Sequence, residues 1–167
     1  MREANLVEIW IRKDPIRWLA GALGGIFAIA VMIGFAMIAN KLLVGGHDML
    51  APLKIPVTVI MGGDAMNYES TPLVLLAGVF LYSLLGAFLG VAFAHLTGTN
   101  NKAALFGMGI TWGIFGWIFL ENLFSKSWQP IKILEIPATW GFLGWVLFGV
   151  SLMSVGFFDQ MLRSKKN

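Results

Sequence analysis

The chain has no cysteine and only two histidines among its 167 residues. The lack of cysteine excludes disulfides, thiolate metal sites, iron–sulfur clusters and thiol nucleophiles. Charged residues are also scarce, at 13% of the chain, whereas soluble domains carry about 25%. Hydrophobic residues make up 57%, and the mean hydropathy is +0.77. This balance excludes a disordered tail, a nucleic-acid-binding module and most soluble enzymes. It predicts an integral membrane protein whose surroundings are the lipid bilayer, with no nucleic-acid partner.

Four stretches without charged residues are long enough to cross a bilayer, which takes about 20 residues of helix. Lipid offers no hydrogen-bond partner to the backbone, so each stretch is expected to be helical. The predicted fold class is all-α integral membrane, with one membrane domain over residues 1–167. The expected spans are about 18–40, 73–96, 103–120 and 137–158.

The segments outside these spans differ in character. Residues 1–17 mix charges with apolar side chains, a pattern typical of an amphipathic segment on the membrane surface. Residues 41–71 and 121–136 are expected to form two loops on the outer side. The middle of the longer loop, Ile55 to Met61, is apolar and is predicted to lie on the membrane surface or against a partner. A tight turn from Thr97 to Lys102 predicts that spans two and three form an antiparallel hairpin.

The distribution of basic residues predicts the orientation. Four spans place both chain ends on one side, and that side carries twice as many basic residues as the other. Its basic residues are Arg2, Arg12, Lys13, Arg17, Lys102, Arg163, Lys165 and Lys166, against Lys41, Lys54, Lys126 and Lys132. Cytoplasmic segments of membrane proteins carry the excess of Lys and Arg, so both termini are expected in the cytoplasm.

Ionisable residues are absent from the middle of every predicted span. Such residues are costly in the membrane and mark ion pathways, so their absence argues against ion transport. No serine or threonine has a histidine or carboxylate base nearby, and we expect no enzymatic activity and no metal site. His47 and His95 are expected on opposite sides of the membrane and therefore cannot clamp a haem together. His95 alone is a candidate pigment ligand, although a hydrogen-bonded interfacial histidine is the favoured interpretation.

Glycines recur at a spacing of four inside the predicted helices. The pairs are Gly21 and Gly25, Gly86 and Gly90, and Gly109 and Gly113, and span four adds Gly141, Gly144 and Gly149. Glycine at this spacing lets two helix backbones approach closely. Packing within the chain is the favoured explanation, and packing against a helix of another protein is the alternative; both can hold together.

The N-terminal segment carries a recognisable motif. An Ile-Trp pair, Ile9 and Trp10, is followed after three residues by Asp14 and Pro15, and then by Arg17. Residues 9–38 thereby resemble the α polypeptide of the core light-harvesting antenna of purple photosynthetic bacteria. The helix of that family runs from inside to outside, which is the orientation predicted here from charge. Independently of any family, Asp14 is a good N-cap for a helix that begins at Pro15.

One departure from the family is informative. The histidine that ligates the chlorophyll magnesium in the family lies twenty residues beyond the aspartate, and Gly34 stands at that position here. A tryptophan expected eleven residues later is replaced by Gly45. Glycine has no side chain to ligate magnesium, so the resemblance implies a helix that takes an antenna position without its pigment, unless a water molecule serves as the ligand.

The resemblance implies a non-catalytic accessory subunit of a photosynthetic reaction centre–light-harvesting complex in the bacterial inner, intracytoplasmic membrane. The α-like helix would dock in or at the end of the antenna ring, and the other three helices would block the next α/β pair by bulk. The ring would then keep a gap for quinone and quinol exchange. Partners would be light-harvesting α/β polypeptides and reaction-centre subunits, with bacteriochlorophyll, carotenoid or quinone adjacent rather than bound. The docking residues would be Trp10, Asp14, Pro15, Arg17, Gly21, Gly25 and Gly34.

Three other functions stay open at this point. The chain could be an accessory or assembly subunit of another membrane complex, such as a respiratory oxidase. It could be a small carrier for a neutral or lipid-like solute, for which a broken helix would be a supporting sign. It could also be a pigment-binding antenna protein that uses His95, or backbone and water ligands.

Overall fold

The computed structural model describes residues 14–43, 49–61, 71–124 and 138–165, and all regular structure in these ranges is helical. The helices are α2 (Pro15–Leu43), α3 (Ala51–Met61), α4 (Pro72–Thr97), α5 (Lys102–Gly116), η2 (Trp117–Phe124), α7 (Ala138–Ser151) and α8 (Ser154–Ser164). Four stretches are long and apolar enough to cross a membrane: Pro15–Leu42, Pro72–Thr97, Lys102–Leu120 and Ala138–Ser164. The prediction of an all-helical chain with four candidate spans is confirmed, and the side on which the termini lie stays a prediction.

The start of α2 follows the predicted cap. Asp14 Oδ1 accepts a hydrogen bond from the Arg17 N–H at 3.1 Å, and the Asp14 carbonyl accepts from the Trp18 N–H at 3.0 Å. Pro15 occupies the first helical position, where its missing N–H costs nothing. The helix therefore begins three residues before the predicted span, and residues 15–17 of the expected surface segment belong to it. The rest of that segment, residues 1–13, lies outside the described residues.

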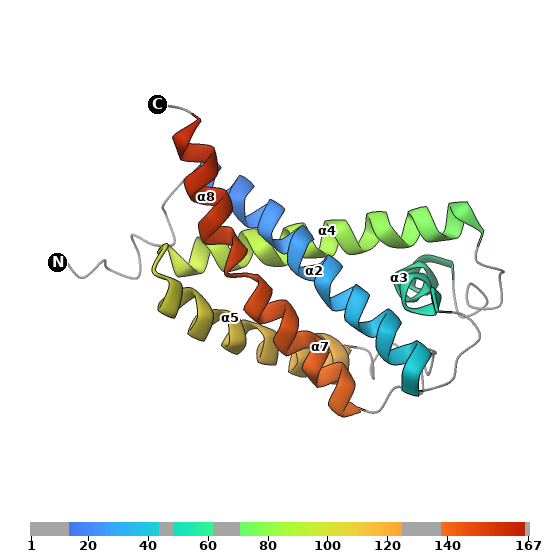
Figure 1. Cartoon of the computed structure of the whole chain (residues 1–167). Coiled ribbons are helices and arrows are strands. Elements are labelled where there is room, and N and C mark those ends of the chain that lie inside the picture. The colour runs from blue at the N-terminus through green and yellow to red at the C-terminus, as the bar shows by residue number, and fades with distance from the viewer. Residues whose placement is uncertain (1–13, 44–48, 62–70, 125–137, 166–167) are drawn as a thin grey trace.

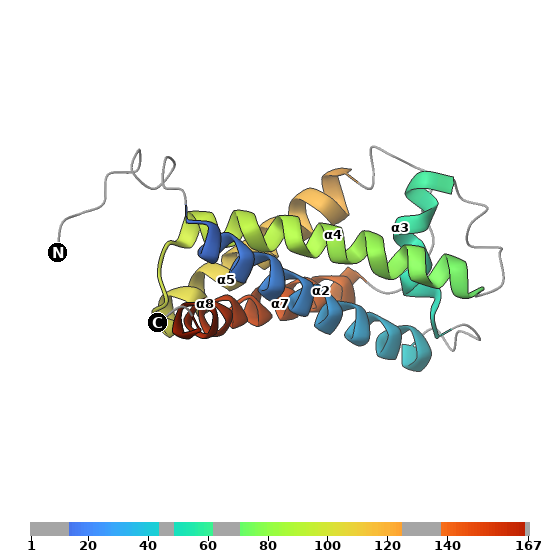
Figure 2. The same ribbon diagram turned by 90° about the horizontal axis from the view of Figure 1, so that it is seen from above.

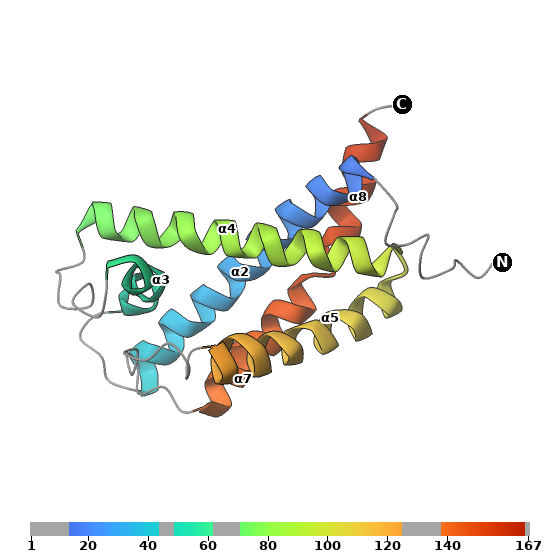
Figure 3. The same cartoon turned by 180° about the vertical axis from the view of Figure 1, so that it is seen from behind.

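A four-residue turn joins α4 to α5, as predicted. Gly98 ends α4 in a left-handed conformation with φ 56°, and its N–H donates to the Ala94 carbonyl at 3.4 Å. Asn101 caps α5 through its Oδ1, which accepts from the N–H groups of Ala103 and Ala104. Beyond the turn the two helices diverge (Figure 3), because α4 packs along α2 whereas α5 packs along α7.

Glycines bring both of these helix pairs into close contact. A Cβ on Gly25 would overlap the Gly86 carbonyl oxygen of α4, and a Cβ on Gly90 would overlap the Gly21 carbonyl oxygen of α2. Gly109 and Gly149 meet in the same way between α5 and α7. The glycine spacing therefore serves packing within the chain, which was the favoured interpretation.

Helix α3 lies beside α4 at the end of the bundle away from the α4–α5 turn (Figure 2). Its Val57 is buried against Val74 of α4, and the Tyr82 hydroxyl of α4 donates to the Pro52 carbonyl at 3.1 Å. The segment Ile55 to Met61, expected on the membrane surface or against a partner, forms most of α3 and packs on its own chain.

The fourth span is broken at Leu152 and Met153, between α7 and α8 (Figure 1). The N–H of Met153 donates to the Val150 carbonyl at 3.1 Å, and the N–H of Val155 donates to the Leu152 carbonyl at 3.0 Å. These bonds span three residues instead of four, so the helix tightens and changes direction. Val155 then packs on Gly24 of α2, and α8 lies against the first turns of α2. The span contains no proline between Ala138 and Ser164, and its sequence did not predict the break.

Candidate functional site

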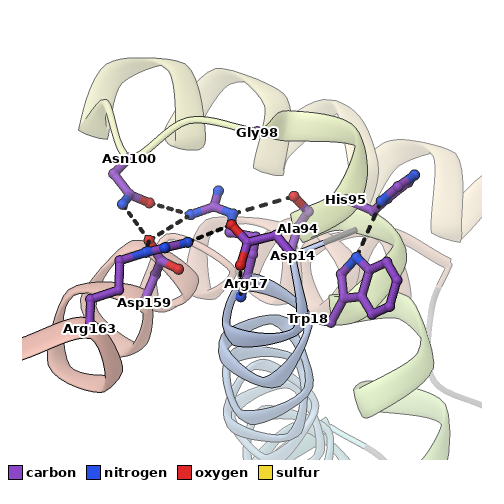
Figure 4. A pocket seen from close by; sticks show the side chains of 9 residues that line it. All are labelled: Asp14, Arg17, Trp18, Ala94, His95, Gly98, Asn100, Asp159 and Arg163. Atoms are coloured by element: carbon purple, nitrogen blue, oxygen red, sulfur yellow. Dashed lines mark hydrogen bonds and ion pairs between the residues drawn. The ribbon is translucent and has the colours of Figure 1, made fainter. Parts of the chain in front are cut away.

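A polar cluster joins three distant parts of the chain at one end of the bundle (Figure 4). It consists of Asp14 and Arg17 from the start of α2, Asn100 from the α4–α5 turn, and Asp159 and Arg163 from α8. These segments are the start of the first span, the turn between the second and third spans, and the end of the fourth span. The cluster therefore links all four spans at one end.

Arg17 is buried at the centre of the cluster, with 7% of its side chain exposed. Its Nε donates to the Ala94 carbonyl at 3.4 Å, and its Nη2 donates to the Thr99 carbonyl at 2.6 Å. Its Nη1 donates to Asn100 Oδ1, and Nη2 also reaches Thr97 Oγ1 at 3.3 Å. The last turn of α4 and the turn after it thus supply acceptors for every nitrogen of the guanidinium.

The carboxylates balance the charge of the two arginines. Asp159, with 2% of its side chain exposed, accepts on Oδ2 from Asn100 Nδ2 at 2.6 Å and from Arg163 Nε at 3.1 Å. The same oxygen lies 3.6 Å from Arg17 Nη1. Arg163 Nη2 donates to Asp14 Oδ2 at 2.6 Å, which joins residues 149 positions apart. Two positive and two negative groups give this cluster no net charge.

We call this polar cluster the clasp, because its ion pairs join the start of α2 to α8. A cavity of about 180 Å³ lies among these side chains, and the lining contains no hydroxyl or thiol that could act as a nucleophile. Within the described ranges, no group of three or more His, Cys, Asp or Glu side chains could hold a metal ion. The pairs Arg17–Asp159 and Asp14–Arg163 hold the start of α2 against α8. Removing one partner of a buried ion pair is costly, because it leaves an uncompensated charge.

His95 lines the same cavity from α4 (Figure 4). Its Nδ1 accepts a hydrogen bond from Trp18 Nε1 at 3.3 Å. Indole can only donate, so Nδ1 is the acceptor in this hydrogen bond. A metal-ligating histidine donates its other N–H instead. This hydrogen bond favours a structural role for His95 over the role of pigment ligand.

The predicted docking residues fall into separate groups. Arg17, Gly21 and Gly25 face the interior of the bundle, and Asp14 divides its carboxylate between the helix cap and Arg163. Pro15 is exposed, and Trp10 lies outside the described residues. Gly34 differs from the other two glycines, because nothing lies within 4 Å of the position that its Cβ would take.

One face of α2 remains uncovered by the described parts of the chain. The spacing of its exposed positions follows the helical repeat and places them on one stripe, which we call the α2 face. It comprises Leu19, Ile26, Phe27, Ala30, Gly34 and Ile38, of which Gly34 is half-buried and the others are exposed. Ala20, Ala28, Ile29 and Ile33 of the same helix are buried in the core. The α2 face is apolar along its whole length, with a notch at Gly34.

Sequence reasoning missed the roles of Asn100 and Asp159. A signal was present, because Arg17 and Asp159 both lie at the ends of long apolar runs. A four-span topology places the start of the first span and the end of the fourth on the same side of the membrane. Charged residues of opposite sign at these two positions could have been paired on that basis.

Comparison of the chain with protein families, curated proteins and solved structures found no match.

Proposed function

We propose that the protein is a non-catalytic accessory subunit of a photosynthetic reaction centre–light-harvesting complex. In this proposal α2 takes the place of an antenna α helix in or at the end of the ring, and the ring keeps a gap for quinone and quinol exchange. Both termini lie in the cytoplasm and the protein belongs to the bacterial intracytoplasmic membrane.

The observation that carries the proposal is the α2 face. Residues 9–38 resemble the antenna α polypeptide, and the helix with this motif has an exposed apolar stripe with a notch at Gly34. A helix that has to contact a neighbouring antenna subunit needs such a stripe, and small residues on it permit close approach. Docking therefore rests on Gly34 and its neighbours on the α2 face, while Gly21 and Gly25 serve the contact with α4.

The residues present do not fit a bacteriochlorophyll ligated in the way the family ligates it. Gly34 has no side chain to offer the magnesium, and the notch contains no histidine within the described residues. The subunit thus contributes shape and bulk to the complex. Helices α4, α7 and α8 pack on α2, and α5 packs on α7. An antenna polypeptide has no such further helices, and in this proposal they occupy the space of the next α/β pair.

The experiment is affinity purification of the tagged full-length chain from membranes of a photosynthetic host. Reaction-centre and antenna subunits should co-purify with the wild-type chain. Gly34→Phe, which fills the notch, should abolish this association. Gly107→Phe is the matched control, since Gly107 on α5 also has nothing within 4 Å of its Cβ position.

Recovery of a respiratory complex in place of antenna subunits would overturn the proposal and favour the alternative of an accessory subunit elsewhere. Equal association of the Gly34→Phe and Gly107→Phe chains would show that the α2 face is not the docking surface.

A further inference from the structure

An apolar groove runs between the last turn of α4 and the outer face of α5. It encloses about 560 Å³, within the range of about 300–1,000 Å³ that is usual for ligand pockets. The lining residues are Phe93, Leu96, Thr97, Ala103, Ala104, Gly107, Met108, Thr111, Trp112 and Phe115. The groove exists because α4 and α5 diverge from their turn to pack on different partners (Figure 3).

The wall of the groove offers no free hydrogen-bond donor from its side-chain hydroxyls. Thr97 Oγ1 donates to the Phe93 carbonyl at 2.9 Å, and Thr111 Oγ1 donates to the Gly107 carbonyl at 3.1 Å. Gly107 adds open space, because nothing lies within 4 Å of its Cβ position. An apolar surface whose two hydroxyls already have acceptors is suited to a hydrocarbon chain.

The dimensions favour an acyl chain over a helix. From Ala103 to Phe115 the groove follows α5 for about 18 Å, at about 1.5 Å per residue, which is close to one leaflet of a hydrocarbon core about 30 Å thick. Near the turn the walls are joined by only the four residues 98–101. At that end the turn leaves room for a single chain rather than for a helix about 10 Å across.

A basic residue just outside the groove indicates the headgroup. Lys102 begins α5 one residue before Ala103 and is exposed, beyond the turn end of the groove lining. Within the described part of the chain, Lys102 takes part in no ion pair. A basic residue at the membrane surface attracts anionic lipid, and the positive end of the α5 dipole adds to the attraction.

We propose that this groove holds one acyl chain of an anionic bilayer phospholipid, with the lipid phosphate beside Lys102 and the chain end near Phe115. The site is separate from the α2 face, so it stands whether or not the protein docks on an antenna ring.

The test is native mass spectrometry of the full-length chain in detergent, titrated with dioleoylphosphatidylglycerol or dioleoylphosphatidylcholine. The wild-type chain should retain one phospholipid and should prefer phosphatidylglycerol. Lys102→Ala should reduce that preference by about fivefold, the contribution of one lysine near an anionic surface. Gly107→Leu should fill the groove and lose the retained lipid of either kind.

Gly34→Leu is the matched control and should retain lipid like the wild-type chain, since its open space lies on α2. Ala103→Leu fills the other end of the groove and should act like Gly107→Leu, which guards against a folding defect in one variant. The proposal is overturned if both groove variants retain phospholipid as well as Gly34→Leu does. It is equally overturned if the wild-type chain appears as a lipid-free dimer.

Discussion

Arg17 shows why one residue type is required at the start of α2. A guanidinium presents five N–H groups in a fixed plane, and the end of α4 and the following turn present acceptors around it. A lysine has three donors on one nitrogen and cannot reach the same acceptors together. The charge of Arg17 is compensated by Asp159, which comes from the opposite end of the chain.

Loss of Asp159 should therefore be costly. We expect Asp159→Leu to lower the free energy of unfolding by about 3–5 kcal/mol, because the buried ion pair between Arg17 and Asp159 would be broken. The measurement is reversible unfolding in mixed micelles. The double variant Arg17→Met with Asp159→Leu should recover much of the loss. Lys165→Leu, an exposed change nearby, should stay within about 0.5 kcal/mol of the wild type. Equal stability of Asp159→Leu and Lys165→Leu would contradict the clasp.

The two glycines Gly25 and Gly34 lie on the same helix and should respond in opposite ways to alanine. Gly25→Ala places a methyl group on the Gly86 carbonyl and should destabilise the protein by about 1–3 kcal/mol. Gly34→Ala meets open space and should be neutral or stabilise by up to about 1 kcal/mol through helix propensity. Thermal unfolding of the two variants in the same detergent compares them directly. Matching midpoints would argue against the close contact between α2 and α4.

At the scale of the element, the break in the fourth span allows buried packing at the junction of α7 and α8. Leu152 and Val155 are fully buried, and the tightened turn between α7 and α8 directs both into the core. The break also leaves Ser154 Oγ buried with no hydrogen-bond partner among the described residues. A hydroxyl in this position contributes nothing that offsets its desolvation.

Ser154→Ala should for that reason stabilise the protein, by about 1 kcal/mol, because an unsatisfied buried hydroxyl is removed. Ser83→Ala is the matched control, since Ser83 Oγ donates to the Val79 carbonyl at 2.7 Å and is not part of the break. Unfolding in mixed micelles gives both values. A loss of stability in Ser154→Ala greater than that in Ser83→Ala would mean that the hydroxyl has an essential partner.

The elements were predictable to different degrees, for physical reasons. The four spans follow from apolar length alone, and the start of α2 follows from Asp14 and Pro15, because caps act through neighbouring residues. The spacing of Gly21 and Gly25 favours close packing within the chain. It does not identify α4 as the partner, since the same spacing suits any partner helix. The clasp depends on Asp159 meeting Arg17, and the break at Leu152 depends on packing against Gly24. Both are contacts between distant segments that local patterns do not specify.

At the scale of the whole molecule, the distribution of basic residues predicts one orientation, with both termini in the cytoplasm. The chain has no native cysteine, so single cysteines can report it without a background. Lys102→Cys and Lys165→Cys should react with a membrane-impermeant maleimide from the cytoplasmic side, in inside-out vesicles. Lys41→Cys, at the far end of α2, should react only in right-side-out preparations. Labelling of Lys102→Cys and Lys41→Cys from the same side would refute the four-span topology.

The ion pairs of the clasp can form only after α8 has been synthesised. Asp14 and Arg163 are 149 positions apart, so at about 5–20 residues per second the ribosome needs roughly 7–30 s to deliver the second after the first. Throughout that interval the start of α2 lacks the ion pairs that Asp159 and Arg163 of α8 supply. A nascent chain that stalls before α8 would therefore keep both ion pairs unmade.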